Sequence, residues 1–446
     1  MQQIWKLLAF INHPIRNYFL AAASAVMLAS CGGGGVPHWV GTKQMGVAGH
    51  DTYGISVATD ANGNVYVTGL TNGGLDGNTL TGNYDFFVTK YNSSGVKQYT
   101  RQMGVAEQDT VGRSVATDAN GNVYVAGWTS GGLDGNTRIG TTDFFFTKYN
   151  SSGVKQYTRQ LGVAGEDTDG ISVAIDANGN VYVAGYTFGG LDGNTLSGIR
   201  DFFVTKYNSS GVKQYTRQMG VAGEHTNSVS LAIDANGNVY VAGSTRGDLD
   251  GNTQTGTNDF FFTKYNSSGV KQYTRQMGVT GASTIGYSVA TDASGNVYVA
   301  GFTYGGLDGN TLTGTVDSFI TKYNSSGVKQ YTRQMGVAGK STEGLSVATD
   351  VNGNVYVAGS TRGGLDLNTL TGTSDFFFTK YDISGVKQYT RQLGVAGLYT
   401  QGQSAATDAN GNVYVAGYTY GGLDGNTLTG TLDSFVTKYN SSGVKQ

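Results

Sequence analysis

The chain is poor in several residue types that common protein classes need. Its 446 residues include one cysteine, two prolines and four histidines, and only 13% of them are charged. A single cysteine excludes a disulfide framework and a zinc site built from cysteines. The formal net charge is −2, and no basic stripe is visible. Because phosphate backbones are bound by clustered Lys and Arg, we expect no nucleic acid partner.

Catalytic signatures are also scarce. Beyond the N-terminal segment the histidines are His38, His50 and His225, and each has different neighbours. No Gly-x-Ser-x-Gly nucleophile motif occurs. The sequence therefore predicts no catalytic residues and no cofactor. A catalytic site built from residues that occur once and do not form a known motif stays open as a lesser alternative.

What the chain has in abundance is repetition. The 71 glycines and 29 tyrosines recur at regular spacing, as in short strands joined by tight turns. A 58-residue unit is repeated seven times, over residues 45–102, 103–160, 161–218, 219–276, 277–334, 335–392 and 393–446. Internal periodicity of this length overrides the expectation of several independent domains and indicates a repeat architecture.

The two ends of the repeat array complement one another. The seventh repeat lacks a last segment Tyr-Thr-Arg-Gln, which the first repeat has at Tyr99–Gln102. A similar segment, Gly41–Gln44, precedes the first repeat. We therefore expect a closed ring in which the N-terminal segment completes the last repeat. Val444–Gln446 also aligns with His38–Val40, so the two ends compete for part of one strand.

Each repeat reads as four strands. In the first repeat we expect strands at Gly54–Asp60, Asn64–Thr71, Asp85–Tyr91 and Val96–Gln102. An Asn-Gly pair in the first hairpin predicts a turn with positive φ at both residues. The second and third strands are almost continuously apolar, which is typical of a sheet covered on both faces.

Four strands per repeat, seven repeats and two buried sheet faces together indicate an all-β fold, a seven-bladed β-propeller with four antiparallel strands in each blade. The last blade would be completed by the N-terminal strand. A β-solenoid is the structural alternative, but it would need atypical capping repeats at both ends. We expect residues 38–446 to form the propeller, and we expect it to be a monomer.

Three segments of the second repeat carry a family resemblance: Asp118–Gly127, Gly131–Thr137 and Asp143–Gln160. They resemble the bacterial seven-bladed beta-propeller repeat family, and the likeness covers residues 38–446. The resemblance implies a secreted or surface protein and no common enzymatic activity. One departure is that Tyr99 and its equivalents stand where the family usually has tryptophan.

The N-terminal segment resembles the export signal of bacterial lipoproteins. Lys6 and Arg16 precede the apolar run Leu20–Ala29, which is too short to span a membrane. The run ends in Leu28-Ala29-Ser30-Cys31, a sequence similar to a lipobox. The resemblance implies a signal peptide over residues 1–30, lipidation of Cys31 and a glycine-rich tether over residues 31–37. The alternatives are an ordinary secretory leader and a buried thiol. Gly32 rather than an aspartate follows the cysteine, and by resemblance to lipoprotein sorting in two-membrane bacteria this favours the outer membrane.

Differences between the repeats cluster at a few positions. These lie in the links from the fourth strand to the next first strand and from the second strand to the third, which emerge on one face. The hairpin turns on the other face barely change. Varied chemistry on a rigid scaffold suits recognition, although neutral drift of exposed loops would look the same. The varied aromatic residues could equally serve to pack neighbouring blades together. The candidate ligand-binding residues are Asp51, Asp109, Asp167, Trp128, Tyr186, Phe188, Arg246, Phe302, Tyr304, Tyr418 and Tyr420.

Two repeated charge patterns have structural explanations. The segment Leu75–Thr79 (LDGNT) recurs in every repeat, with Leu367 replacing a glycine once. Its oxygens together with Asp85 could hold calcium, but an Asx turn explains the motif better, so we predict no metal site. Asp60, Asp85, Lys90 and Arg101 also recur in nearly every repeat, which fits a structural network.

These observations favour a non-enzymatic, lipid-anchored envelope protein that binds a protein or polysaccharide through its variable face. Membrane contact would be through the lipid anchor only. The alternatives are a structural or assembly scaffold of the envelope that uses the repeated face and, less favoured, a hydrolase or lyase with a site at the axial mouth.

Overall fold

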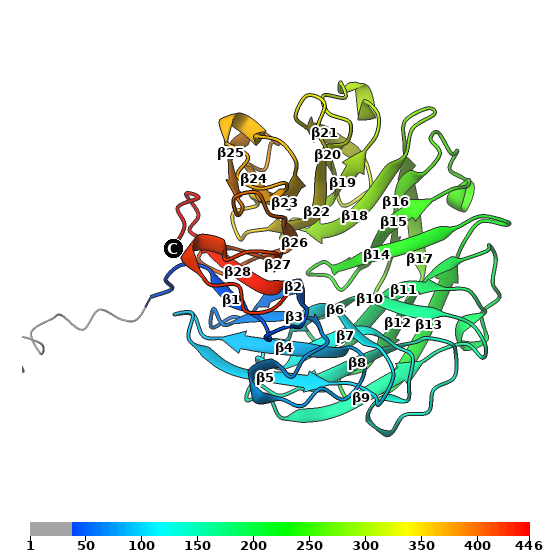
Figure 1. Cartoon of the computed structure of the whole chain (residues 1–446). Coiled ribbons are helices and arrows are strands. Elements are labelled where there is room, and N and C mark those ends of the chain that lie inside the picture. The colour runs from blue at the N-terminus through cyan, green and yellow to red at the C-terminus, as the bar shows by residue number, and fades with distance from the viewer. Residues whose placement is uncertain (1–37) are drawn as a thin grey trace, which may run out of the picture. The chain divides into compact units, whose positions relative to one another are not determined.

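The computed structural model describes residues 38–446. The expected signal peptide, Cys31 and the glycine tether lie outside the described residues. Trp39–Gln446 form one unit of seven antiparallel sheets, each with four strands. The sheets are arranged around a common centre, and the first strand of each sheet lies innermost (Figure 1). This is the expected seven-bladed β-propeller.

The strands recur with almost the same bounds in every blade. Blade one contains β2 (Thr52–Thr59), β3 (Val65–Thr71), β4 (Asp85–Tyr91) and β5 (Lys97–Met103). Blade two contains β6 (Thr110–Thr117), β7 (Val123–Thr129), β8 (Asp143–Tyr149) and β9 (Lys155–Leu161). Blade three contains β10 (Thr168–Ile175), β11 (Val181–Thr187), β12 (Asp201–Tyr207) and β13 (Lys213–Met219). Blade four contains β14 (Thr226–Ile233), β15 (Val239–Thr245), β16 (Asp259–Tyr265) and β17 (Lys271–Met277).

Blade five contains β18 (Thr284–Thr291), β19 (Val297–Thr303), β20 (Asp317–Tyr323) and β21 (Lys329–Met335). Blade six contains β22 (Thr342–Thr349), β23 (Val355–Thr361), β24 (Asp375–Tyr381) and β25 (Lys387–Leu393). Blade seven combines β26 (Thr400–Thr407), β27 (Val413–Thr419) and β28 (Asp433–Tyr439) with the N-terminal β1 (Lys43–Met45).

The link between the second and third strands contains a short 3₁₀ helix in every blade: η1 (Leu75–Gly77), η2 (Leu133–Gly135), η3 (Leu191–Gly193), η4 (Leu249–Gly251), η5 (Leu307–Gly309), η6 (Leu365–Leu367) and η7 (Leu423–Gly425). The expected first hairpin turn needs correction. In the first hairpin only Gly63 has a positive φ, of 73°, while Asn62 does not. The turn closes instead through Asp60, whose carboxylate accepts the backbone N–H groups of Asn62 and Asn64, both at 2.9 Å.

The core lies between the blades. Aromatic and aliphatic side chains of the two middle strands face the neighbouring sheet, as with the stacked rings of Phe86 and Phe145, whose centroids are 5.2 Å apart. Burial on both faces explains why these strands lack an alternating polar pattern. A full ring of such contacts leaves each blade covered by two others.

The repeated charges form the expected structural network. Asp60 is 6% exposed and also accepts hydrogen bonds from the Asn64 side chain and the Tyr66 hydroxyl. Lys90 and Arg101 reach into the next blade and donate to the carbonyls of Ser151 at 2.9 Å and Gly153 at 2.7 Å. Because buried polar groups must be paired, the network is needed for the fold rather than for one site.

The ring closes without a covalent link. β1 pairs antiparallel with β28 in the register Lys43 to Val436, Gln44 to Phe435 and Met45 to Ser434. The two ends share the outer strand of blade seven. Gln446 pairs with one part of β28, Lys43–Met45 pair with the other part, and the Gln446 carbonyl accepts the Gly41 N–H at 2.7 Å. β1 (blue) therefore lies beside β28 (red) in Figure 1. The N-terminal closure expected from the sequence is confirmed.

Trp39 completes this closure. In the other blades the tyrosine of the outer strand covers a turn glycine of the next blade, as Tyr99 covers Gly153. Blade seven has no such tyrosine, and the indole of Trp39 lies against the equivalent Gly95. Its exposed fraction is 2%, and its ring meets Tyr414 edge-on with the centroids 5.5 Å apart.

Candidate functional site

The innermost strand of every blade contains a β-bulge. In blade one the register shifts between Gly54 and Ser56, so Ile55 has no partner in the ladder. Bulges redirect side chains, and here the bulged residues line a cavity of about 240 Å³ on the axis. Those residues are Ile55, Arg113, Ile171, Val229, Tyr287, Leu345 and Gln403.

The next residue on each inner strand is an invariant serine. Its hydroxyl accepts the backbone N–H of the following blade, for example Ser230 from Val289 at 3.1 Å and Ser346 from Ala405 at 3.0 Å. The seventh of these bonds, from Val57 to Ser404 at 3.2 Å, joins blade one to blade seven. The serines therefore hold the inner strands together, while the bulged position is left to vary.

A wider pocket of about 450 Å³ adjoins the axial cavity on the variable face. Three predicted residues line it: Asp109, Trp128 and Tyr418. The other lining residues are Tyr53, Ile55, Leu70, Tyr84, Val111, Arg113, Tyr287 and Gln403. We call this cavity the mouth pocket. Most of its wall comes from blades one, two and seven, so it lies to one side of the ring.

The chemistry of the mouth pocket is aromatic with a few polar groups. The rings of Tyr53 and Tyr418 meet edge-on, with centroids 5.1 Å apart. The indole N–H of Trp128 is buried and has no partner among the described residues. Burial, followed by the nearby Asp51 charge, raises the pKa of Tyr53 to about 12. Its phenol therefore stays protonated and can donate a hydrogen bond.

Further tyrosines extend this wall on blade seven. The hydroxyls of Tyr399 and Tyr418 both donate to the side-chain oxygen of Gln401, at 2.6 and 2.7 Å. Tyr420 packs against both rings at 6.2 and 6.4 Å and is 42% exposed. The wall is therefore fixed by hydrogen bonds, and it presents one ring to solvent.

Blades three and four hold a second group of predicted residues. The Tyr186 hydroxyl donates to Asp169 at 2.8 Å, and its ring lies 6.3 Å from that of Phe188. Arg246 is exposed, and its Nε donates to the side chain of Asn258 at 3.2 Å. Asp167 accepts the hydroxyls of Thr141 and Thr142. None of these residues lines the mouth pocket.

The remaining predicted residues are scattered. Asp51 accepts the Thr431 hydroxyl and lies at the joint of blades one and seven. Phe302 is half-buried between Tyr287 and Tyr304, each 6.3 Å away. Tyr304 is 50% exposed and lies outside the mouth pocket. The structure thus brings together only part of the predicted set.

Several lining residues were missed by the sequence prediction. Tyr84 precedes the third strand, while Arg113, Tyr287 and Gln403 occupy the bulged position. Comparison of the repeats would have found them, because both positions differ from blade to blade. The missing information was that a bulge directs its residue to the axis.

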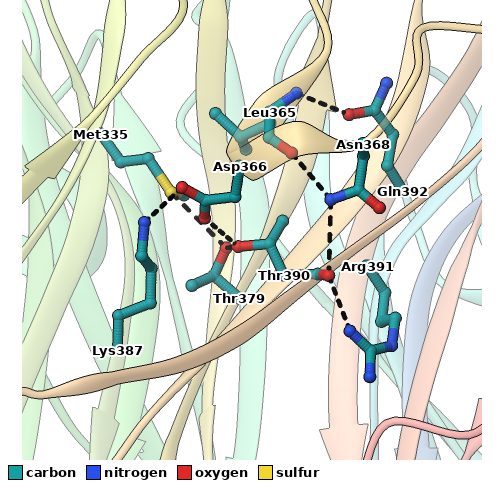
Figure 2. Close-up of polar contacts among 9 residues, drawn as sticks. All are labelled: Met335, Leu365, Asp366, Asn368, Thr379, Lys387, Thr390, Arg391 and Gln392. Atoms are coloured by element: carbon teal, nitrogen blue, oxygen red, sulfur yellow. Dashed lines mark hydrogen bonds and ion pairs between the residues drawn. The ribbon is translucent and has the colours of Figure 1, made fainter.

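The repeated Leu-Asp-Gly-Asn-Thr loops are held by protein donors. In blade six Asp366 forms an ion pair with Lys387 and accepts the Thr390 hydroxyl (Figure 2). The Asn368 side chain donates to the Leu365 carbonyl at 2.7 Å. The motif was predicted to be held by Asx-turn hydrogen bonds. Instead the carboxylate of the aspartate bonds to the outer strand, and the asparagine side chain donates to the leucine carbonyl. Among residues 38–446 no group of three or more His, Cys, Asp or Glu is placed to hold a metal.

The sequence profile of one family matches every blade. The profile of the SBBP beta-propeller repeat matches residues 40–76, 98–134, 156–192, 214–250, 272–308, 330–366 and 388–424. The chain belongs to the SBBP beta-propeller repeat family. The expected family is therefore confirmed. Within residues 38–446 of this SBBP propeller, no helix has the length and apolar character to cross a bilayer.

Two curated proteins resemble this SBBP propeller at low identity. Regulatory protein FlaEY of Caulobacter vibrioides is 27% identical over 376 residues, which is 74% of this chain and 38% of that protein. An uncharacterised WD repeat-containing protein of Acanthamoeba polyphaga mimivirus is 25% identical over 43% of this chain and 18% of its own length. This SBBP propeller thus spans well under half of either relative.

Solved structures resemble this SBBP propeller more distantly. A chain of the mitotic checkpoint complex has 13% identity and a TM-score of 0.49, and covers 85% of this chain and 88% of its own. The WD40 propeller domain of Doa1 has 10% identity and a TM-score of 0.47, with coverage of 89% and 97%. An ulvan lyase has 13% identity and a TM-score of 0.45, with coverage of 84% and 93%. At these values they say nothing about the ligand of this chain.

Proposed function

We propose that the chain is a non-enzymatic binding propeller of the cell envelope that holds a polysaccharide in its mouth pocket. One observation supports this most strongly: every side chain that lines the pocket comes from a repeat position that varies, and the pocket opens on the variable face. A scaffold without a ligand would have no need for an asymmetric hollow in an otherwise repeated ring.

The lining fits a sugar better than a flat protein surface. Aromatic rings stack on the C–H faces of sugars, while the Asp109 carboxylate and the Arg113 guanidinium suit hydroxyl groups. The unpartnered Trp128 N–H adds a buried donor, which costs free energy unless a ligand oxygen accepts it. If proteins bind to the propeller and glycans do not, the ligand is a protein partner instead.

A glycan array followed by calorimetry tests the proposal. Trp128→Ala should lower the affinity for any glycan bound by the wild type about tenfold or more, because a stacked ring and a donor are both lost. Tyr304→Ala is the matched control, since it removes an exposed ring of the same face outside the pocket. Equal affinities for Trp128→Ala and wild type would contradict the proposal.

A second candidate function rests on the opposite face. The valine after the second hairpin turn is exposed in all seven blades, from 53% at Val96 to 57% at Val154. Seven identical apolar contacts would suit an envelope scaffold with a repeating partner. Binding of envelope proteins that Val154→Ser and Val212→Ser weaken, with glycan binding absent, would favour this function.

The location of the protein is part of the proposal. A lipid on Cys31 would anchor the propeller to the envelope, probed below by substitution of that residue. The outer membrane is the proposed site, and the propeller would then present its mouth pocket to wall or surface polysaccharides.

A further inference from the structure

Three chain segments with basic side chains run side by side on the variable face. Arg200 precedes β12, His225 precedes β14, and Arg246 follows β15. Arg200 and His225 form a parallel bridge, and the Thr226 N–H donates to the Arg200 carbonyl at 2.8 Å. The Arg246 N–H donates to the His225 carbonyl at 3.1 Å. The backbone therefore holds two arginines and one histidine on neighbouring segments.

These basic groups lack acidic partners. The ion pairs found among residues 38–446 all join a lysine to an aspartate, and none includes Arg200 or Arg246. Asp169 acts on Arg200, and Glu224 acts on His225, but neither forms an ion pair with them. Asp169 is instead held by the Tyr186 and Thr142 hydroxyls, each at 2.8 Å.

Buried polar atoms at the same place have no partners within the described chain. They are Nε of Arg200, Nδ1 of His225 and Oδ1 of Asn227. Such atoms are normally paired, because a buried donor or acceptor without a partner is costly. Two of the three are nitrogens of the basic groups. Burial, together with the charges of Arg200 and Arg246, also lowers the pKa of His225.

An aromatic wall adjoins the basic groups. The guanidinium carbon of Arg200 lies 4.6 Å from the ring centre of Tyr186 and 5.2 Å from that of Phe188. Stacking fixes the plane of the guanidinium, and its Nε has no partner among the described residues, so this N–H can meet an oxyanion. Phe188 is half-buried, so part of its ring stays accessible.

We propose that Arg200, His225 and Arg246 form a binding site for a carboxylate or sulfate group of an acidic polysaccharide, with Phe188 supporting the sugar ring. The site deepens the proposed function and rests on it for the nature of the polymer. The site takes the charged substituent, while the mouth pocket would hold another part of the same polysaccharide.

No other joint between blades within residues 38–446 places two arginines and a histidine on neighbouring segments. Arg362 occupies in blade six the position of Arg246, and its N–H likewise donates to the residue before the inner strand, Ser341, at 2.9 Å. Its neighbours are Val316 and Ser341 in place of Arg200 and His225. Arg362→Gln therefore removes the same charge from the same face without touching the proposed site.

Calorimetry with matched polymers tests the site. The probes are polygalacturonate against its methyl ester and dextran sulfate against dextran, so that each pair differs only in charge. Wild type should prefer the acidic member of at least one pair, and the pair shows whether carboxylate or sulfate is bound. Arg200→Gln and Arg246→Gln should each weaken acidic binding at least tenfold, while Arg362→Gln stays within about twofold.

Other outcomes are equally clear. Equal losses for Arg246→Gln and Arg362→Gln would overturn the site, since binding would then reflect general charge. Binding of both members of each pair with no effect of any arginine variant would overturn the site but keep the proposed function. If no polymer binds but inorganic sulfate shifts the His225 imidazole signals in NMR, and Arg246→Gln abolishes the shift, the anion site stands and the polysaccharide function fails.

Discussion

Removal of the Trp39 side chain is the sharpest test of the closed ring. The indole is 2% exposed, donates to the Gly41 carbonyl at 2.8 Å and packs against Tyr91 and Tyr414. Truncation of a buried Trp to Ala costs about 3–5 kcal/mol, because transfer free energy and packing are both lost. We expect Trp39→Ala to lose about that much stability.

The position of the Trp39 indole at the closure of the propeller adds a second expected effect of Trp39→Ala. Trp39 replaces the outer-strand tyrosine that elsewhere covers the next blade, so its loss loosens β1 and exposes the edge of β28. An uncovered edge strand pairs with other chains. Trp39→Ala should therefore raise light scattering as well as lower the urea midpoint followed by circular dichroism.

Val40→Ala provides the control in the same segment. Val40 is 65% exposed, and surface truncations change stability by about 0.5 kcal/mol or less. A Trp39→Ala loss below about 1 kcal/mol, with no rise in scattering, would refute the view that this segment locks the ring.

Three further predictions concern the turns, the tyrosines and the anchor. Asp60→Asn should cost about 2 kcal/mol, because one side-chain oxygen is lost and a buried donor is left unpaired; Asp382→Asn, which restores the asparagine found in the other blades, should be neutral in the same urea titration. Burial raises the pKa of Tyr99, Tyr215 and Tyr273 to about 12 from 10.0. Their folded state binds the phenolic proton more tightly, so stability is intact below pH 10 and falls between pH 10 and 12. A urea midpoint that stays unchanged as the pH rises from 10 to 12 would argue against this. Cys31→Ser should move the protein from the membrane fraction to the soluble fraction, and unchanged sedimentation with membranes would count against lipidation.

The sequence predicted the architecture well because the pattern of strands and turns that makes one blade recurs in seven repeats. Apolar runs such as Val65–Val67, the hairpin glycines and the complementary ends each followed from local rules or from the repeat itself. Strand bounds differed by one or two residues, as with β2, which begins at Thr52 rather than Gly54. Repetition averages out the ambiguity of any single segment.

The site was predicted less well for a physical reason. Alternation along a strand told which residues lie near the variable face, but the bulge after Gly54 breaks that alternation. Arg113 and Tyr287 therefore reach the axis, whereas Phe188 and Arg246 lie at the joint of blades three and four. Which varied residues meet depends on the curvature of the whole ring, which no single repeat encodes.

The bulged residues make the lining of the axial cavity separable from the stability of the ring. A residue outside the ladder can be exchanged without loss of a strand-to-strand hydrogen bond, while the adjacent serine keeps neighbouring blades joined. The chain thus offers seven exchangeable bulged positions around one axial cavity. The lining of this cavity can be changed, by evolution or by engineering, one position at a time while the strand pairing of the ring is kept.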